Sequence, residues 1–495
     1  MFEKLRNIIS EKIAKSVMKI YPAHNGTVSI LETVDFETNA AINKIWFRGD
    51  ASELSQLYRQ LPDSSCSFWG AKMTQGNEIR KIHIGLPGIM VNVLAGIITD
   101  DLQELKLEDE NIKKLWKEIE SKCHFKKAVK KAVLETLVTG DGAFKISLDS
   151  SVSEYPFLEF FGADRIEIIR SRGTIKEIIF KTPYYDGTRE YTLFEHYGTG
   201  YINYILKDSG GNKIPLETLP YTSNLVNVKF EGNFMLADYI SFYDSDKWDG
   251  RGRSIFDSKR GNFDSIDEIY SQWVDAVRAG RAKTYIPEML LPRRTDGSVM
   301  RGNSFDNRFI RLESDVSENG KNEIKVVQPD IPHESYLSAY VTALDLCLQG
   351  IISPSTLGID TKKLDNAEAQ REKEKTTLYT RQTIINAIQP VLSGIVLKML
   401  NSYRLANKKS LYDIKIDVTF GEYANPSFES QIETVSKGHT AGIMSIEACL
   451  DELYGDTKSD TWKKEEADRL RKEQGLFETD EPALNLDFNN LPEGE

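Results

Sequence analysis

The spacing of hydrophobic residues changes twice along this chain. Up to about residue 150, apolar residues recur at intervals of three and four, which is the spacing of helices with one buried face. From residue 143 to residue 242, short runs rich in Ile, Val, Phe, Tyr and Thr alternate with turns rich in Gly, Asp and Asn, a pattern typical of antiparallel hairpins. Helical spacing then dominates again. The pattern predicts an α+β protein that is mainly helical.

Two helices are predicted on either side of an inserted segment. The first covers residues 262–280, where Asp264 is available near the N-terminus and Gly280 can end the helix. The second covers residues 332–349, and the insert at 285–327 contains Pro, Gly and Arg with a few strand-like pieces. The apolar positions on one face are Phe263, Ile266, Tyr270, Trp273 and Val277 in the first helix, and Leu337, Val341, Leu344 and Leu348 in the second.

A polar, turn-prone segment at residues 353–365 precedes a long helical pattern at 366–402. Such a helix would be about 55 Å long at 1.5 Å per residue. Pro390 lies inside it, where the missing amide hydrogen and the ring are expected to kink the helix. Further on, the pattern predicts a strand at residues 412–420, helices at 427–454 and 459–474, and a disordered acidic tail of about twenty residues.

Two apolar segments raise the question of a membrane. Residues 85–99 are interrupted by Pro87 and Asn92 and are too short to span a bilayer, so they are predicted to form a buried helix. Residues 1–20 predict an amphipathic helix that lies on a membrane surface or docks on its own protein, and docking is the commoner case. We therefore expect no membrane partner. The apolar face of that helix consists of Phe2, Leu5, Ile9, Ile13, Val17 and Ile20.

Acidic residues outnumber basic ones, 75 to 63, which leaves a formal net charge of -12. This balance argues against tight wrapping of nucleic acid, because affinity for DNA comes mainly from cations that neutralise phosphates. Any DNA contact should be local or loose. The cysteines lie far apart without CxxC spacing, which predicts reduced thiols and neither a zinc site nor a disulfide framework. They are Cys66, Cys123, Cys347 and Cys449.

The sequence contains no recognisable catalytic motif. It has no GxxxxGK(S/T) phosphate loop and no GxGxxG that opens a helix, and its six histidines form neither HExxH nor HxH. The carboxylates of Asp244, Asp246 and Asp249 could bind a hard cation, but they lack the order of an EF-hand, and a turn stabilised by Asp side chains is the better interpretation. We expect no cofactor, no metal and no enzymatic activity.

Two blocks of sequence resemble the portal proteins of tailed bacteriophages, in particular the family found in siphophages and prophages of Gram-positive bacteria. The block SDKWDGRGRSIFDSKRGNFDSIDEIYSQWVDAVRAGRAKTYIPEMLLP resembles the family's approach to its first stem helix and clip. The block ISPSTLGID, followed by NAEAQREKEKTTLYTRQTI, resembles its tunnel loop and the head of its long kinked helix. The similarity runs in order over roughly residues 20–475, and these two blocks are its distinctive parts.

Portals of this family are rings, usually dodecameric, with wing, stem, clip and crown regions. The resemblance implies a wing at 1–261, a first stem helix at 262–284, a clip at 285–330, a second stem helix at 331–352, a tunnel loop at 353–366, the long kinked helix and a returning wing strand at 367–425, a crown at 426–475 and an acidic tail at 476–495.

The resemblance also implies a function and partners. The expected assembly is a homo-oligomeric ring at one capsid vertex, through which double-stranded DNA is packaged and ejected. The clip of such a ring docks the terminase large subunit and later the head-completion adaptor, and major capsid and scaffolding proteins are further partners. We expect a location in the virion, with assembly in the host cytoplasm. An acidic wall with few cations fits such a conduit, because strong phosphate binding would raise friction.

Candidate site residues follow from the same resemblance. In the tunnel loop, two cations that face DNA or are merely solvated lie beside an apolar residue that could narrow the bore. These loop residues are Thr361, Lys362, Lys363 and Leu364. In the clip, five arginines contact the motor or adaptor, or are solvated or paired with acids of a neighbouring subunit. They are Arg293, Arg294, Arg301, Arg308 and Arg311. The charges of residues 371–375 alternate in sign and could meet a neighbouring subunit or solvent.

Two other classes of protein remain as alternatives. A minor capsid or connector protein would be a structural head component without a DNA channel, and the order helix, insert, helix, loop, long helix favours the portal over it. A nuclease or nucleotidyl transferase would use acidic residues and Mg²⁺, and the spacing of the carboxylates does not support it.

Overall fold

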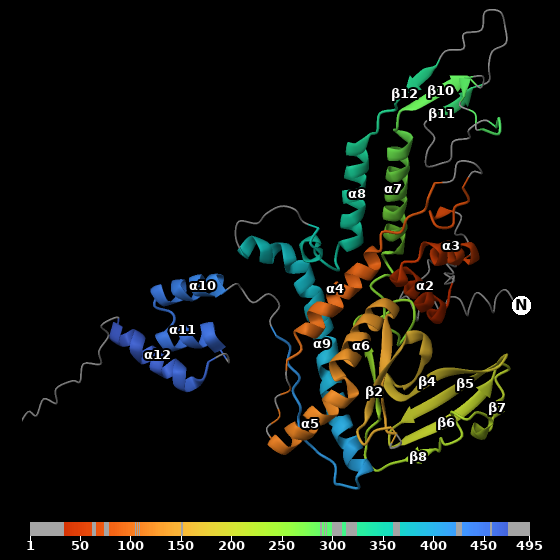
Figure 1. Cartoon of the computed structure of the whole chain (residues 1–495). Coiled ribbons are helices and arrows are strands. Elements are labelled where there is room, and N and C mark those ends of the chain that lie inside the picture. The colour runs from red at the N-terminus through yellow and green to blue at the C-terminus, as the bar shows by residue number, and fades with distance from the viewer. Residues whose placement is uncertain are drawn as a thin grey trace, which may run out of the picture. The chain divides into compact units, whose positions relative to one another are not determined.

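The structure is a computed structural model in which helix and strand are mixed, as the α+β prediction requires (Figure 1). It divides into two compact units, of which the first takes residues 1–362 and 372–421 and the second takes 363–371 and 422–495. The residues described are 34–61, 66–73, 79–103, 105, 107, 109–149, 152–287, 290, 291, 293, 295–298, 309–312, 324–359, 367–421, 428–455 and 458–473.

Three of the five helices described before the first strand, α2, α3 and α5, are capped by aspartates. The side chains of Asp35, Asp50 and Asp109 each accept a backbone N–H from the first turn of the helix that follows, which satisfies donors that a helix leaves unpaired. The helices are α2 (Phe36–Arg48), α3 (Ala51–Gln60), α4 (Leu86–Asp100), α5 (Glu110–Cys123) and α6 (Phe125–Thr139). The apolar helix α4 is largely buried, as its sequence predicted.

Two antiparallel sheets follow α6, which confirms the strand-rich segment predicted from residue 143. The smaller sheet has the order β2-β1-β9, and the larger has the order β3-β4-β5-β6-β7, with β8 paired to β6. The strands are β1 (Asp141–Ser147), β2 (Phe157–Gly162), β3 (Ile166–Ser171), β4 (Thr174–Asp186), β5 (Arg189–Gly198), β6 (Tyr201–Asp208), β7 (Lys213–Ile214), β8 (Val228–Lys229) and β9 (Ala237–Ser241).

One hydrophobic core joins α4, α6, both sheets and the long helix α9 (Ala367–Ala406). Pro390 lies inside α9, and the helix is continuous through it. A part of α9, Glu374–Ala406, is long and apolar enough to cross a membrane by length and composition. Many of its apolar side chains, among them Ile388 and Leu392, are buried in this core, so packing within the protein accounts for much of its composition.

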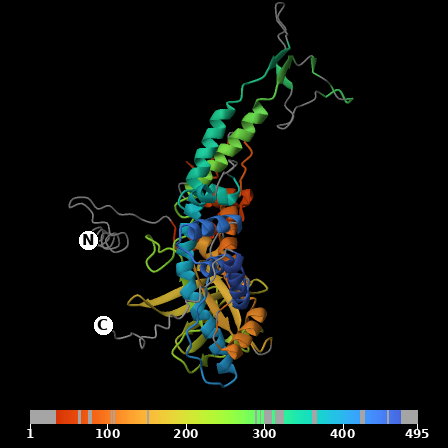
Figure 2. The ribbon, with the colours of Figure 1, turned by 90° about the vertical axis from the view of Figure 1, so that its left-hand side faces the viewer.

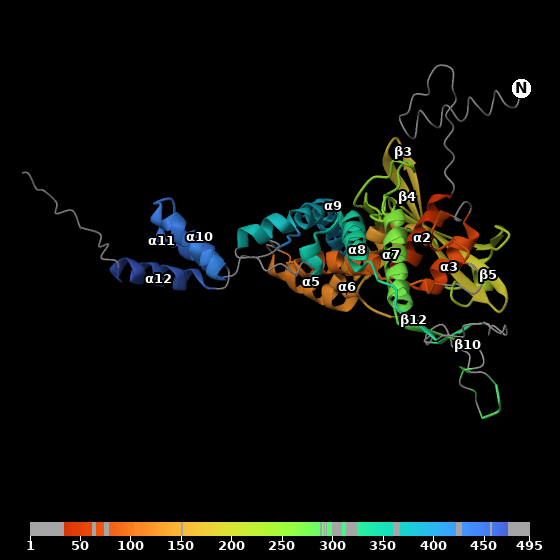
Figure 3. The same ribbon diagram turned by 90° about the horizontal axis from the view of Figure 1, so that it is seen from above.

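A helical hairpin carries a small sheet at its far end (Figures 1 and 2). Helices α7 (Arg260–Ala279) and α8 (His333–Leu348) lie side by side, as the view from above also shows (Figure 3). The sheet has the order β11-β10-β12, with β10 parallel to β11 and antiparallel to β12. Its strands are β10 (Lys283–Pro287), β11 (Phe309–Leu312) and β12 (Lys325–Val327). Both helices lie within two residues of their predicted bounds, and Gly280 ends α7 as expected.

The second unit contains α10 (Phe428–Thr440), α11 (Ile446–Tyr454) and α12 (Asp460–Glu473). One helix was predicted over 427–454, and the prediction was wrong because the chain turns at Gly442, which has φ 71, and restarts at Ser445, whose side chain caps α11. Helix α11 packs against both neighbours around Ile446, Leu450 and Ala467. The acidic tail lies outside the described residues.

The strand predicted at 412–420 was also wrong. In this segment Phe420 forms an isolated bridge with Leu102, and the described residues make no ladder there. Ile416 and Val418 are nevertheless buried. Their β-branched composition therefore reflects burial against the core rather than pairing in a sheet.

Candidate functional site

Aromatic rings join the two helices of the hairpin. The rings of Trp273 and Tyr336 are nearly parallel, with an interplanar angle of 5° and centroids 6.3 Å apart. The ring centroid of Tyr340 lies 6.2 Å from that of Tyr270 and 6.3 Å from that of Trp273. These large side chains therefore hold α7 to α8 within one subunit.

The apolar face predicted for α8 is buried in its lower half and exposed in its upper half. Leu344 and Leu348 are buried at the base of the hairpin, but Leu337 is 50% exposed and Val341 is 47% exposed. The four residues recur at the predicted spacing, but only the lower two are buried. Only the last turns of α8 reach the core of the first unit, so its upper half has α7 as its main support.

Helix α7 is fastened on its other side by a segment that we call the strap, residues 66–73 and 79–84. The carboxylate of Asp264 accepts the backbone N–H groups of Phe68 and Trp69 at 2.7 and 3.2 Å. Two turns further along α7, Ser271 Oγ accepts the N–H of Ile82 at 3.0 Å. Asp264 was predicted as a residue available to start the helix, but it binds the strap instead, and α7 begins at Arg260 without a side-chain cap.

Asp267 is the most enclosed of these groups. Its side chain is 1% exposed and lies 2.6 Å from Nδ1 of His83, which is itself 2% exposed. It also accepts the indole N–H of Trp69 and the backbone N–H of Ile84, both at 3.1 Å. Because a buried carboxylate is costly unless hydrogen-bonded, these three contacts make the position of the strap on α7 highly specific.

The electrostatics of the strap reflect burial. Loss of solvent raises the pKa of Asp264, and the two N–H groups that it binds oppose that rise. Lys81 donates from Nζ to the carbonyls of Phe68, Trp69 and Ala71, and burial lowers the pKa of this ammonium. The ammonium thus satisfies three carbonyls of one turn and fixes the shape of the strap.

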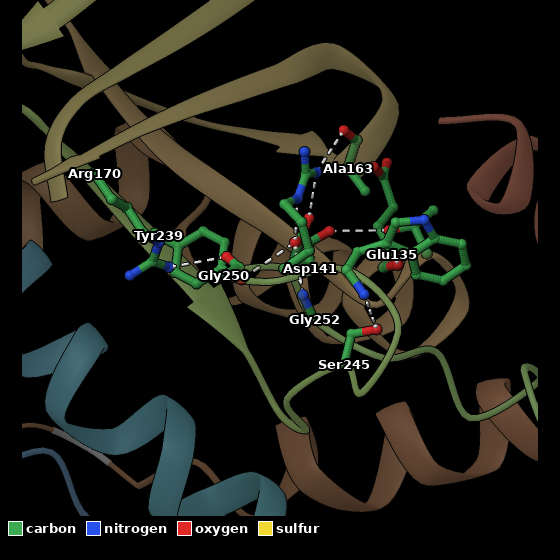
Figure 4. Close-up of polar contacts among 11 residues, drawn as sticks. Glu135, Asp141, Ala163, Arg170, Tyr239, Ser245, Gly250 and Gly252 are labelled. Carbon is green, nitrogen blue, oxygen red and sulfur yellow. Dashed lines mark hydrogen bonds and ion pairs between the residues drawn. The ribbon is translucent and has the colours of Figure 1, made fainter. Parts of the chain in front are cut away.

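A second polar cluster explains much of the sequence block around GRGRS (Figure 4). The guanidinium of Arg251 binds the fully buried carboxylate of Asp141 from Nε at 2.8 Å and from Nη2 at 2.9 Å. Asp141 also accepts the hydroxyl of Tyr239 and the N–H of Gly252. A Cβ at Gly252 would lie 2.2 Å from the carbonyl oxygen of Gly140, so this approach of two backbones requires glycine.

The acidic residues of the same block do not gather around a cation. Asp244 forms a bridge with Gly252, and Ser245 Oγ accepts the N–H groups of Lys247 and Trp248. A serine therefore stabilises the turn that was predicted to depend on aspartates. Among the described residues, no group of three His, Cys, Asp or Glu side chains could hold a metal ion.

The predicted clip arginines are only partly placed. Arg311 stands opposite Ile286 in the parallel pair β10–β11, and Arg293 is exposed. Arg294, Arg301 and Arg308 lie outside the described residues. The structure therefore brings one of the five arginines into the small sheet, and their role in binding a partner stays a prediction.

The turn that precedes the predicted tunnel loop is well defined. Residues Pro354–Leu357 form a short 3-10 helix. The N–H of Ser353 donates to Thr377 Oγ1 at 2.9 Å, and Thr356 Oγ1 lies 2.8 Å from the same oxygen. The loop residues themselves lie outside the described residues: Thr361, Lys362, Lys363 and Leu364. The turn that precedes these residues is thus hydrogen-bonded to the buried Thr377 of α9. The contact of the loop residues with DNA stays a prediction.

The charges near the start of α9 are partly buried. Glu374 is 8% exposed and Arg381 is 6% exposed. Arg381 binds Asp101 through Nη2 at 2.7 Å and also donates to the carbonyl of Gly421. At Glu374 this overturns the expectation of a charge that meets solvent or a neighbouring subunit. The side chains of residues 371–373 lie outside the described residues.

Sequence reasoning missed His83, Asp267, Arg251 and Arg381 as structural centres. Asp267 interrupts the apolar face of α7 directly after Ile266, and a carboxylate at such a position is a signal for a buried polar contact. Arg251 stands between two glycines, which indicates a tight backbone approach. His83 and Arg381 carried no comparable signal, since their partners lie 184 and 280 residues away.

Comparisons with known proteins found similarity of fold only. No family model and no curated protein matches the sequence. A chain in the virion of a native gene transfer agent particle has 14% identity over 73% of this chain and 87% of that chain, with a TM-score of 0.40. Chains in the neck of the empty particle, computed with C6 symmetry, and of the native particle, computed with C12 symmetry, have 12% and 13% identity. Each covers 74% of this chain, and 90% and 89% of the respective neighbour, with TM-scores of 0.40.

Proposed function

We propose that this chain is a phage portal protein, the subunit of a ring through which double-stranded DNA enters and leaves a capsid. The order of elements carries the proposal: a two-helix hairpin with a small sheet at its far end, then a turn, then a helix of 40 residues. That order is what the resemblance of the two sequence blocks implies. The ring is homo-oligomeric, and twelve subunits is the number that we expect.

Within this proposal, each region has a role. Helices α7 and α8 are the stem, β10 to β12 belong to the clip, residues 353–366 are the tunnel loop, and α10 to α12 are the crown. The clip docks the terminase large subunit and then the head-completion adaptor, while major capsid and scaffolding proteins surround the wing. The chain acts without catalysis, in the virion after assembly in the host cytoplasm.

The charge balance supports a conduit rather than a clamp. A net charge of -12 per subunit gives a ring whose overall field repels DNA. Each phosphate held by a cation releases counterions and must be freed again before DNA moves on. An acidic ring therefore lets DNA slide.

Electron microscopy of the purified full-length chain tests the proposal. We expect rings with a central hole wide enough for duplex DNA. The variant Trp273→Ala with Tyr336→Ala, which removes the stacked pair of the hairpin, should reduce the fraction of rings, while Tyr185→Ala at an exposed position of the large sheet should not. Particles that contain the chain in a head structure without a central channel would favour the alternative of a connector protein.

A further inference from the structure

Helices α5 and α6 carry a local excess of positive charge. Residues 110–139 contain eight lysines against four glutamates, in a chain whose net charge is -12. Six of these lysines are exposed residues that we call the lysine surface. They are Lys114, Lys117 and Lys122 of α5 and Lys126, Lys127 and Lys130 of α6.

The two helices that carry the lysine surface are held together by aromatic packing. Only His124 separates α5 from α6. The rings of Trp116 and Phe125 meet edge to face, with centroids 5.1 Å apart and an interplanar angle of 83°. Helix α5 lies at the end of the first unit that is remote from the small sheet β10–β12 (Figures 1 and 2). The lysine surface is thus separate from the hairpin.

The charges at the start of α6 work against the helix that carries them. Helices α2, α3 and α5 each have an aspartate cap and a glutamate in the first turn, whereas α6 begins after His124 with neither. Lys126 and Lys127 add positive charge at the helix end where unpaired N–H groups already concentrate it. Lys126 and Lys130 are four residues apart, where like charges repel. Buried apolar side chains hold α6 in place, so folding does not explain these lysines.

The same three lysines have no counter-charge within the chain. Among the residues that the structure describes, no side chain forms an ion pair with Lys126, Lys127 or Lys130. By contrast, the next lysine, Lys131, lies 3.7 Å from Glu135, and two arginines of α12 each have an acidic partner three residues away. Spacings of one, three and four place the three unpaired ammonium groups on one side of α6. That side can therefore bind an anion from outside the chain.

The composition of α5 and α6 indicates which kind of anion fits. Protein interfaces have an apolar centre and are enriched in arginine and depleted in lysine, whereas residues 110–139 contain no arginine and no exposed apolar side chain. Single strands of nucleic acid are held by stacking on aromatic rings, and the rings of Trp116 and Phe125 are buried here. Helices that bind membrane surfaces insert apolar side chains. Lysines alone suit the backbone of a duplex, which carries one charge per about 1.7 Å.

We propose that the lysine surface binds the phosphate backbone of double-stranded DNA without reading its sequence. The positive charge is local in a chain that is acidic as a whole, so the contact is weak and readily reversed. This binding site goes beyond the proposed portal function, because it lies apart from the hairpin and does not depend on the formation of a ring.

The number of unpaired lysines gives the proposal a magnitude. Each lysine that meets a phosphate releases counterions, so the logarithm of the association constant falls with the logarithm of the salt concentration by about 0.9 per contact. Contacts from Lys126, Lys127 and Lys130 together account for about 2.7 of that slope.

Filter binding of closed circular duplex DNA to the full-length chain tests the site. A closed circle cannot thread through the hole of an assembled ring, so its retention on the filter reports binding elsewhere on the protein. We expect two circles of unrelated sequence to bind equally, and their binding to weaken steeply as salt rises. Failure of the unmodified chain to retain either circle at low salt would overturn the proposal.

A triple substitution tests the residues. Lys126→Gln with Lys127→Gln and Lys130→Gln should weaken binding of the circles at least about tenfold at about 100 mM salt, and should lower the salt slope by about 2.7. The matched control removes the same charge from exposed positions of the large sheet, by changing Lys176, Lys213 and Lys229 to Gln, and should bind like the unmodified chain. Equal weakening by both triple variants would mean that only net charge matters, which contradicts the proposal.

Stability measurements exclude a structural role of the three lysines. Because Gln relieves the repulsion at the start of α6, the α6 variant should resist urea at least as well as the unmodified chain. A variant that lost stability together with DNA binding would show that these lysines serve the fold, and the proposal would be wrong.

Competition identifies the partner. Linear duplex DNA should displace the circles, whereas polyglutamate and vesicles of phosphatidylglycerol at the same charge concentration should not. Displacement by polyglutamate would assign the surface to an acidic protein, and displacement by vesicles would assign it to a membrane, so either result would overturn the proposal. Rings that do not retain circles would refute this site alone. Circle binding by a chain that forms no ring in particles would refute the portal function alone.

Discussion

Arg251 and Asp141 are 110 residues apart in sequence and form a two-pronged ion pair in which the carboxylate is fully buried. The guanidinium also lies 3.9 Å from the centre of the Phe36 ring and donates to the carbonyl of Ala163. The pair therefore links the start of β1 to α2 and to the turn after β2. Removal of the guanidinium would leave a buried, unpaired carboxylate, which would lower the stability of the fold considerably.

We expect Arg251→Met to lower the free energy of unfolding by about 3–5 kcal/mol, because it leaves the buried charge of Asp141 unpaired. Urea denaturation followed by circular dichroism measures the change. The matched control is Lys415→Ala, since Lys415 and Asp417 form a pair with side chains 87% and 63% exposed, and its effect should stay below about 1 kcal/mol. A loss at Arg251 no larger than that of the control would refute this account of the pair.

The stacked rings of the hairpin should be energetically coupled. A double-mutant cycle with Trp273→Leu and Tyr336→Leu is expected to give a coupling of about 0.5–1.5 kcal/mol. Tyr221→Leu serves as the distant control, because Tyr221 is 77% exposed in the turn between β7 and β8, and its effect should add to that of Trp273→Leu. Additivity of the first pair would show that the two rings touch without stabilising the hairpin.

The cysteines should differ sharply in reactivity. Burial raises the pKa of Cys123 and of Cys347 to about 12, so both remain protonated thiols at pH 8, whereas Cys66 is exposed. Because the thiolate is the reactive form, a thiol-specific chromogenic reagent at pH 8 should modify Cys66 first and the two buried thiols only in denaturant. Rapid modification of Cys347 in the native chain would mean that the base of α8 opens readily.

Alkaline pH should weaken the fold through buried tyrosines. Burial, aided by the charge of Asp264, raises the pKa of Tyr58 from 10.0 to about 12. A phenol whose folded pKa lies above its unfolded value stabilises the fold below pH 10, and this contribution is lost as the pH rises from 10 to about 12. Tyr58→Phe should flatten part of the decline in stability over that window, and Tyr221→Phe, at a 77% exposed position, should leave the decline unchanged.

Local periodicity was enough to predict the hairpin. The spacing of Phe263, Ile266 and Tyr270 defines one face of α7. Gly280 ends the helix, and a glycine at a helix end is a signal that can be recognised from the local sequence. The same spacing could not show that Leu337 and Val341 are exposed, since periodicity identifies a face but not whether anything in the same chain covers it. Gly442 and Ser445 did carry a local signal for the break between α10 and α11, which a closer look for a helix cap could have found.

The polar contacts were beyond prediction for a different reason. Asp264 binds residues almost two hundred positions earlier, and nothing at position 264 specifies which backbone amides it will meet. Arg381 lies in the block that resembles the head of the family's long helix, and its partners Asp101 and Gly421 come from either side of that block. Long-range pairing of this kind depends on the assembled fold, whereas a helix or a turn depends on neighbours in sequence.

The strap restricts the rotation of α7 about its own axis. Asp264, Asp267 and Ser271 occupy one side of α7 at steps of three and four residues, and the strap binds all three. A turn of α7 about its own axis by a fraction of one residue step would misalign every one of these hydrogen bonds together. The strap therefore fixes the rotation of α7 about its own axis. The stacked rings of Trp273 and Tyr336 join α7 to α8, so the orientation of α7 also sets the orientation of the upper half of α8, which is largely exposed. In a symmetric ring, the direction in which each subunit points α8 would be fixed by a segment that precedes the hairpin by almost two hundred residues.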